Sequence, residues 1–445
     1  MNTNKLSYRD TLALGFMTFA FFLGAGNLIF PPFIGFLAGK NMMLAMFGFL
    51  LTGVGLPLLA LIAVAKSNGQ VLGLLPKSIS TLLSFLIFII IGPAFAIPRT
   101  ALVAYDIGFS PFLDEHVPEW SYWEIHFNLA QCLYTFVFFI AVLFFALSPG
   151  KLIDTIGKIL TPILIILLLG LAISVIALPS IPLASAQGIY QLNPFTSGIL
   201  QGYNTMDALG ALVFGILLID VLRQKGINKK SMQTYYLVRA ALIAAMGLAF
   251  VYIALFYLGA SSVGLEYQPS DGGQILTSYV TQHFHYIGLI ILSMVVTIAC
   301  LTTAVGALGA CAEFFHEQLP RLSYTHYLII FSIICSIITN VGLSTLITLS
   351  EPILRIIYPI AITIIIATFL TSQFAFPVLS HCLIVGVAFI FSCLDALAQL
   401  GVVLPFLSFI PLQSQQMTWL LPTVLIIIIC LLIKKKCNLN FFSKK

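Results

Sequence analysis

Residues 21–32 read Phe21-Phe22-Leu23-Gly24-Ala25-Gly26-Asn27-Leu28-Ile29-Phe30-Pro31-Pro32, so two glycines, an amide and a proline pair interrupt a long apolar run. Each glycine costs about 1 kcal/mol of helix stability, and backbone groups freed in hydrocarbon must find new partners. A broken helix is therefore tolerated at membrane depth only where protein buries it or where it lines a cavity. The stretch is either a binding site or a packing seam, because small residues also let membrane helices approach closely.

The composition excludes a soluble protein. Of the 445 residues, 60% are hydrophobic and 8% are charged, with a mean hydropathy of +1.08, whereas soluble domains carry roughly 25% charged residues. No basic patch is interleaved with exposed aromatic residues, so we expect no nucleic-acid partner. The 8 cysteines lie mostly in apolar runs without a CxxC pair or a metal-ligand spacing, which indicates packing residues. The chain is predicted to be a polytopic membrane protein surrounded by lipid.

Apolar runs of the length that spans a bilayer core predict 12 transmembrane helices. They lie near residues 10–37, 42–65, 79–103, 126–147, 152–178, 197–220, 233–259, 286–312, 324–341, 345–370, 375–395 and 417–433.

The basic residues predict the orientation of these helices. Of 20 lysine and arginine residues, Arg99, Arg239 and Arg355 lie within spans and Lys40 alone lies in an outer loop. The other 16 fall on one side if the N-terminus is cytoplasmic, which is a strong positive-inside signal. Both termini are therefore expected in the cytoplasm. The loop from Tyr105 to Glu124 is expected to face outward, with Trp120, Tyr122 and Trp123 as interfacial anchors.

A second polar interruption lies in the sixth predicted span, in Gln201-Gly202-Tyr203-Asn204-Thr205-Met206-Asp207-Ala208-Leu209-Gly210. Interrupted helices at corresponding positions of two halves are typical of transporters with inverted repeats, whose half-helices converge on a midplane site. The predicted architecture is an all-α single domain: a first repeat at about 10–178, a second at about 197–370, and two extra helices at about 375–433. Two unrelated packing glycines remain the alternative.

The eighth predicted span contains Ala299-Cys300-Leu301-Thr302-Thr303, which places two hydroxyls and a carbonyl within one turn. A threonine in a membrane helix most often bonds to its own backbone. Together with carbonyls freed at the first interruption, however, these hydroxyls would offer neutral oxygen ligands to a hard monovalent cation. Sodium is the cation we expect, and no organic cofactor is indicated.

Three segments of the sequence are characteristic: Phe16 to Pro32, Ile91-Gly92-Pro93-Ala94-Phe95-Ala96-Ile97-Pro98-Arg99-Thr100-Ala101, and Gly202 to Ala208. They resemble the branched-chain amino acid:cation symporters, the bacterial system II carrier proteins. The resemblance covers essentially the whole chain. It implies a LeuT-type fold with broken first and sixth helices, a location in the bacterial inner membrane, and uptake of leucine, isoleucine and valine coupled to sodium.

The resemblance also implies roles for individual residues. A substrate carboxylate would be held by backbone N–H groups at the first break, in Gly24, Ala25 and Gly26. Beyond the resemblance, we expect Tyr203, Asn204 and Asp207 at the second break to complete the substrate site. Sodium would bind the carbonyls of Ala20, Leu23 and Ala299 and the hydroxyls of Thr302 and Thr303. Asn27 and Thr205 match two ligands of a second sodium site, but the seventh span has no asparagine to complete it. One sodium per cycle is therefore expected, with Phe21, Tyr203 and Phe214 as walls of an apolar pocket.

The charged residues within the predicted spans allow more than one interpretation. Asp207 departs from the simplest LeuT-type scheme and makes a proton-coupled carrier the second hypothesis. Glu351 and Arg355 have the spacing of an ion pair on one helix face, but Glu351 could instead form an extracellular gate with Arg99. Neither a continuous polar pore nor an HExxH or GxSxG motif occurs. We therefore expect a secondary transporter working by alternating access, and neither a channel nor an enzyme.

Overall fold

The computed structural model describes residues 5–113, 119–122, 125–148, 153–177, 183–262, 269–399, 402 and 410–442. The described chain is helical except for one short hairpin and connecting turns. The orientation anchor Trp123 lies outside the described residues, as do parts of the loop from Tyr105 to Glu124.

Among the described residues, the first half contains eight α-helices and the hairpin. They are α1 (Tyr8–Phe22), α2 (Ala25–Ala38), α3 (Met42–Leu50), α4 (Leu56–Ser67), α5 (Lys77–Ile89), α6 (Ala96–Gly108), β1 (Glu119–Tyr122), β2 (Ile125–Asn128), α7 (Leu129–Ala146) and α8 (Thr161–Ala177). Short 3₁₀ or π segments join several of them: η1 (Gly39–Asn41), η2 (Leu51–Gly55), η3 (Ile90–Ala94), η4 (Ser110–Phe112) and η6 (Ile153–Leu160).

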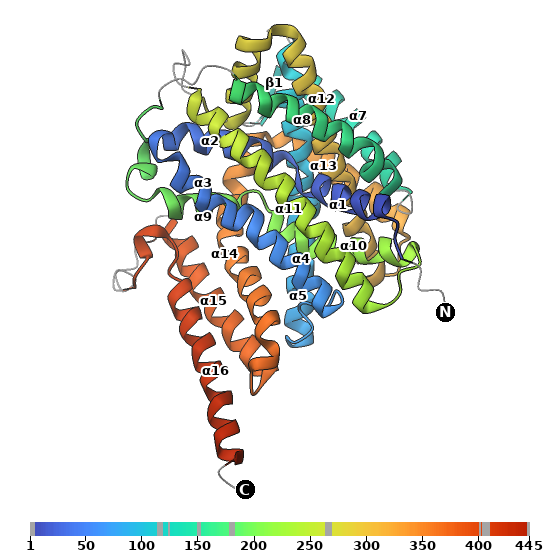
Figure 1. Cartoon of the computed structure of the whole chain (residues 1–445). Helices are drawn as coiled ribbons and strands as arrows, with labels where there is room; N and C mark the ends of the chain where they lie inside the picture. The colour runs from blue at the N-terminus through green and yellow to red at the C-terminus, as the bar shows by residue number, and fades with distance from the viewer. Residues whose placement is uncertain are drawn as a thin grey trace.

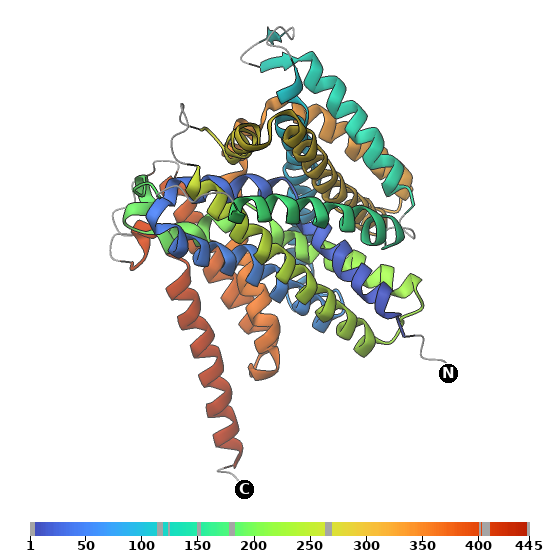
Figure 2. The ribbon, with the colours of Figure 1, turned by 45° about the horizontal axis from the view of Figure 1, so that its top comes forward.

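The second half begins with a second pair of short helices. Its elements are η7 (Gly188–Gln191), α9 (Pro194–Tyr203), α10 (Asp207–Gln224), α11 (Lys230–Ser261), α12 (Gly272–Gln318), α13 (Tyr324–Ile338), η8 (Thr339–Val341), α14 (Leu343–Leu370) and η9 (Thr371–Gln373). The chain then adds α15 (Pro377–Gln399), η11 (Gln413–Gln415) and α16 (Leu420–Phe442). In two views, α16 lies at one side and its end projects beyond the other helices (Figure 1, Figure 2).

Ten stretches of described helix are long and apolar enough to cross a membrane. The difference from the expected 12 has a local cause at each end of the chain. The turn between the first two predicted spans is itself helical, so Ala25–Ser67 forms one stretch, while α1 has only 15 residues. At the other end, the apolar part of α16 is the short Leu420–Lys434. The number 12 therefore stays a prediction.

The first predicted break is confirmed, and it is short. Only Leu23 and Gly24 separate α1 from α2, and Gly24 has φ −110° and ψ −160°. Ala25, Gly26 and Asn27 form the first turn of α2, and the proline pair that follows is carried inside the same helix. The glycine thus sets the break, and the prolines lie beyond it.

The second predicted break is also confirmed, and a third was not foreseen. Asn204, Thr205 and Met206 separate α9 from α10, with Met206 in the left-handed region at φ 63°. The third span is interrupted at Gly92, which has φ −88° and ψ −122°, so that α6 begins at Ala96. The segment on which the family resemblance rests is therefore a helix break as well.

The two broken helices pack on the bundle in reciprocal fashion. Both α1 and α2 run along α11 in the second half, whereas α9 packs on α3 and α10 packs on α4 in the first half. Each half thus contributes its broken helix to the second span of the other half, as two interlocked repeats require. The repeat boundaries themselves remain a prediction.

Glycines allow the backbones of these packed helices to approach closely. A Cβ atom at Gly259 in α11 would lie 1.9 Å from the carbonyl oxygen of Pro32, and one at Gly35 in α2 would lie 2.2 Å from that of Phe256. Gly48 and Gly198 play the same part between α3 and α9. The backbones of facing helices touch at these positions, so no larger residue fits without moving a helix.

We predict that Gly259→Ala lowers thermal stability although alanine is the better helix former, because the new methyl group meets backbone of α2. Overpacking of this kind costs about 1 to 3 kcal/mol. Gly386→Ala in α15 is the matched control, since a Cβ there meets no atom within 4 Å, and it should be neutral or stabilising by up to about 1 kcal/mol. Thermal unfolding in detergent measures both. Equal effects of the two variants would refute the close α2–α11 contact.

Candidate functional site

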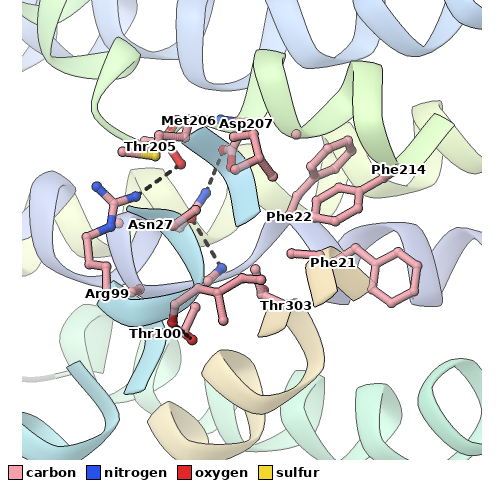
Figure 3. Close-up of a pocket in the computed structure, with 18 residues that line it drawn as sticks. Phe21, Phe22, Asn27, Arg99, Thr100, Thr205, Met206, Asp207, Phe214 and Thr303 are labelled. Atoms are coloured by element: carbon pink, nitrogen blue, oxygen red, sulfur yellow. Dashed lines mark hydrogen bonds between the residues drawn. The ribbon is translucent and has the colours of Figure 1, made fainter. Parts of the chain in front are cut away.

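A small cavity lies where the two breaks meet. It is lined by residues of both interruptions together with side chains of α6 and α12, and its volume is about 30 Å³ (Figure 3). Roughly 10 to 15 Å³ is needed for one water molecule, so the cavity as it stands is too small for a branched amino acid. Gly24, Ala25, Gly26, Asn27, Thr205, Asp207 and Thr303 line it. Entry of an amino acid therefore requires the elements around the cavity to separate.

A larger cavity of about 250 Å³ lies elsewhere, between α8 and α12. Its lining is apolar except for Ser174, whose hydroxyl donates to the carbonyl of Leu171 in its own helix. A site for a charged or zwitterionic ligand needs a few convergent polar groups. The cavity at the breaks has these groups, and the larger one lacks them.

Three buried polar side chains join the two breaks. Asn27 Nδ2 donates to Asp207 Oδ2 at 2.6 Å and also contacts the hydroxyl of Tyr252, which itself donates to Asp207 Oδ2 at 2.8 Å. Asn27 Oδ1 accepts from Gly24 N–H at 3.2 Å. Asn27, Asp207 and Tyr252 are 1%, 4% and 0% exposed. This cluster, called here the amide–carboxylate bridge, ties α2, α10 and α11 together at the cavity.

Two helices begin at the cavity. Gly24 is the residue before the first turn of α2, and Asp207 is the first residue of α10. A helix N-terminus carries unpaired N–H groups and a partial positive charge. The carboxylate of Asp207 therefore lies in the favourable first turn of its own helix, and the start of α2 faces the same cavity with its N–H groups.

The residues expected to bind sodium converge beside the first break. Thr302 Oγ1 donates to the carbonyls of Ala20 at 3.1 Å and Ala299 at 3.0 Å, and Thr303 Oγ1 donates to Ala20 at 3.1 Å. Leu23 is buried next to Gly24, where an added Cβ would lie 2.9 Å from Thr303. Thr302 thus does bond to the backbone of its own helix, as threonines in membrane helices usually do. Both threonines, however, also donate to a carbonyl of α1. Hydroxyl and carbonyl oxygens of α1 and α12 lie together here, as ligands for a hard cation must.

The apolar side of the cavity is aromatic. Phe21, Phe22 and Phe214 all line it, and the Phe214 ring lies 5.3 Å from that of Phe21 and 5.8 Å from that of Phe22. Tyr203, expected as a wall, instead stacks on Tyr358 at a ring distance of 4.5 Å. Phe21 and Phe214 therefore occupy the predicted positions, and Phe22 is an addition.

The structure does not bring the alternative gate pair, Arg99 and Glu351, together. Glu351 forms an ion pair with Arg355 at 2.7 Å within α14, as their spacing predicts. Arg99 lies at the breaks instead, where Nη1 donates to the carbonyl of Asn204 at 2.7 Å and Nη2 reaches the carbonyl of Thr205 at 3.5 Å (Figure 3). The interruption at Gly92 explains the difference, because it restarts the helix shortly before Arg99 and directs that residue to the cavity.

The second-ion candidates have other partners. Asn27 belongs to the amide–carboxylate bridge, and Thr205 Oγ1 donates to the carbonyl of Gly202 at 2.9 Å. Sequence reasoning missed Tyr252 and the place of Arg99. A tyrosine hydroxyl in the middle of the apolar seventh span was the available signal for the first, since a buried hydroxyl requires a partner.

Comparisons with known proteins identify the family of the chain. The family described as "Branched-chain amino acid transport protein" matches residues 7–437. The chain is 44% identical over 428 residues to the branched-chain amino acid transport system 2 carrier protein of Pseudomonas aeruginosa, covering 94% of this chain and 95% of that relative. It is 38% identical over 436 residues to the branched-chain amino acid permease BrnQ of Escherichia coli, covering 97% of both.

Solved structures of remote sequence share the fold. The nucleobase-cation-symport-1 family transporter Mhp1 aligns with a TM-score of 0.59 and 14% identity, covering 96% of this chain and 93% of Mhp1. MhsT aligns with a TM-score of 0.56 and 18% identity, covering 86% of this chain and 98% of MhsT. The LeuT-type architecture with broken first and sixth helices is thereby confirmed. The chain belongs to the branched-chain amino acid transport protein family, a family of transporters and not of enzymes.

Proposed function

We propose that this protein imports leucine, isoleucine and valine together with sodium by alternating access. Transport of branched-chain amino acids follows from the family. The coupling to sodium is our inference, and one observation carries it. The hydroxyls of Thr302 and Thr303 meet the carbonyl of Ala20 at the edge of the first break.

The oxygen atoms at this position suit a sodium ion. Hydroxyl hydrogens rotate, so the threonine oxygens that now donate to carbonyls can turn their lone pairs toward a cation. The ligands are neutral, and no buried carboxylate is required to hold a single positive charge. Sodium bound here would join the last turn of α1 to α12, and it would thereby fix the break that the substrate uses.

The cavity fits the two ends of an amino acid. Asp207 is the acidic side chain that lines it and suits an ammonium group, whereas the N-terminus of α2 suits a carboxylate. Phe21, Phe22 and Phe214 offer an apolar wall to an aliphatic side chain. One methylene contributes only about 1 to 3 kcal/mol of discrimination, so leucine, isoleucine and valine should compete closely.

Substrate entry must change the amide–carboxylate bridge. An ammonium that bonds to Asp207 would replace the amide of Asn27 as a donor, and the two breaks would then separate around the ligand. Since sodium stabilises one side of the first break and substrate the other, each should tighten binding of the other by the same factor.

A proton-coupled carrier is the second candidate, and Asp207 favours it. Its carboxylate is buried and accepts from Asn27 and Tyr252, yet it forms no salt bridge within the described part of the chain. A carboxylate in such surroundings is either matched by a cationic ligand or protonated. We favour the ligand, because the two threonines already offer a place for the coupling ion.

Uptake of labelled leucine into proteoliposomes separates the two candidates. A sodium gradient and a pH gradient are imposed separately, with the membrane potential clamped. The proposal requires accumulation with the sodium gradient alone. Accumulation driven only by the pH gradient would replace it with proton coupling.

Thr303→Ala removes one oxygen ligand from the proposed ion site. We predict a sodium concentration for half-maximal uptake at least about tenfold higher, with rates partly recovered at high sodium. Thr281→Ala is the matched control, because this exposed hydroxyl of α12 donates to the carbonyl of Thr277 in its own helix. An unchanged sodium dependence in Thr303→Ala would show that the ion binds elsewhere.

Asp207→Asn tests the role of the buried carboxylate. If Asp207 holds the substrate ammonium, the variant should bind leucine at least about tenfold more weakly at every pH, because an amide cannot neutralise the charge. If it carries a proton, leucine exchange should survive while pH-driven uptake disappears. Binding and exchange assays distinguish these results. Asp395→Asn, a buried carboxylate that accepts from Thr418 N–H at 3.0 Å, controls for general loss of stability.

A further inference from the structure

Arg99 is the charged residue at the cavity that the proposed mechanism has not used. It lies on α6, is 3% exposed, and lines the cavity with Asn27 and Asp207. An arginine buried in a membrane protein is costly unless anionic or polar partners compensate its charge. The groups that surround Arg99 therefore indicate its role.

The hydrogen bonds of Arg99 are incomplete. The guanidinium has five N–H donors. Nη1 donates to Asn204 O at 2.7 Å and Nη2 reaches Thr205 O at 3.5 Å, while Nε has no acceptor among the described residues. The Phe30 ring lies 5.6 Å from the guanidinium carbon. The partners of the guanidinium are thus two neutral carbonyls and a ring face. Within the described part of the chain, its positive charge has no anionic acceptor, and its Nε edge has no hydrogen-bond acceptor.

The guanidinium also lies against the start of α2. A Cβ at Gly26 would be 2.8 Å from Arg99 Nη2, so a side chain at this position would displace the arginine. The N–H groups of the first turn of α2 and the guanidinium therefore border the same space. An Arg side chain binds a carboxylate with two parallel N–H···O bonds. The edge of Arg99 that carries Nε and Nη2 has an N–H donor free for such a pair.

The cavity thus has one cation and one anion among its lining side chains, Arg99 and Asp207 (Figure 3). This pairing matches the two charges of a zwitterionic amino acid. Asn27 stands between them and is already engaged with Asp207 and Tyr252. It is therefore not free to hold a second cation for the substrate carboxylate, and the positive charge at that end comes from Arg99.

We propose that Arg99 binds the α-carboxylate of the substrate, together with the N-terminus of α2, and so selects amino acids over amines and alcohols of the same shape. The proposal rests on the proposed function, because it assumes that the substrate occupies this cavity. The competing explanation is that Arg99 only clamps the second break through Asn204 and Thr205.

Binding of leucine and of leucinol, which carries a hydroxymethyl group in place of the carboxylate, separates the two explanations. Both ligands are titrated calorimetrically onto purified wild type, Arg99→Gln and Arg99→Lys in sodium. We expect Arg99→Gln to raise the Kd of leucine about 30-fold or more, since a buried charge pair is lost, and to change the Kd of leucinol less than about threefold. Arg99→Lys should recover part of the leucine affinity because it keeps the charge.

Arg239→Gln is the matched control. This arginine also lies in an apolar span, but it is exposed and its guanidinium stacks on Tyr235 at 4.2 Å. It should leave both affinities unchanged. If Arg99→Gln does not fold, Arg99→Lys alone still decides, because carboxylate binding requires its ratio of leucine to leucinol affinity to fall several-fold.

Two results would overturn the proposal. Unchanged leucine affinity in Arg99→Gln would exclude contact between Arg99 and the carboxylate. An equal loss of affinity for leucine and for leucinol would show that Arg99 only holds the second break. Neither result would contradict the proposed function. Failure of the wild type to bind leucine would instead overturn both.

Discussion

The amide–carboxylate bridge between Asn27, Asp207 and Tyr252 is the interaction on which the arrangement of the site depends. It joins the first turn of α2, the first residue of α10 and the middle of α11 in a region from which water is nearly excluded. A buried polar group without a partner costs about 1 to 3 kcal/mol. Each of the three side chains therefore fixes the other two, and two breaks far apart in sequence are held facing one cavity.

Close backbone contact makes this bridge possible. Gly35 and Gly259 let α2 lie directly on α11, which brings Asn27 within reach of Tyr252. The breaks in turn create the chemistry of the cavity, because each starts a helix whose N-terminus is suited to negative charge. The cavity beside the bridge measures about 30 Å³. In the proposed mechanism, binding of a substrate would loosen the bridge and so link occupancy of the site to movement of the helices in alternating access.

The parts of the site with a strong local signal could be predicted from the sequence. Gly24 breaks the first span because glycine weakens a helix there, and the neighbouring hydroxyls of Thr302 and Thr303 fall on the face of α12 that meets Ala20. Tyr252 and Arg99 were missed because their roles depend on tertiary packing. The hydroxyl of Tyr252 has no sequence neighbour that reveals Asp207 as its partner. Arg99 was expected at the outer end of an unbroken span, and the break at Gly92 changes where it points.

In the proposed function, the substrate occupies the space between the two breaks. A cryo-electron microscopy structure of the protein with leucine and sodium would show whether it does. We expect leucine between α2 and α10, with its carboxylate at Arg99 and the start of α2, its ammonium at Asp207, and its side chain against Phe21 and Phe214. Leucine bound in the larger cavity between α8 and α12, with the amide–carboxylate bridge intact, would contradict this expectation.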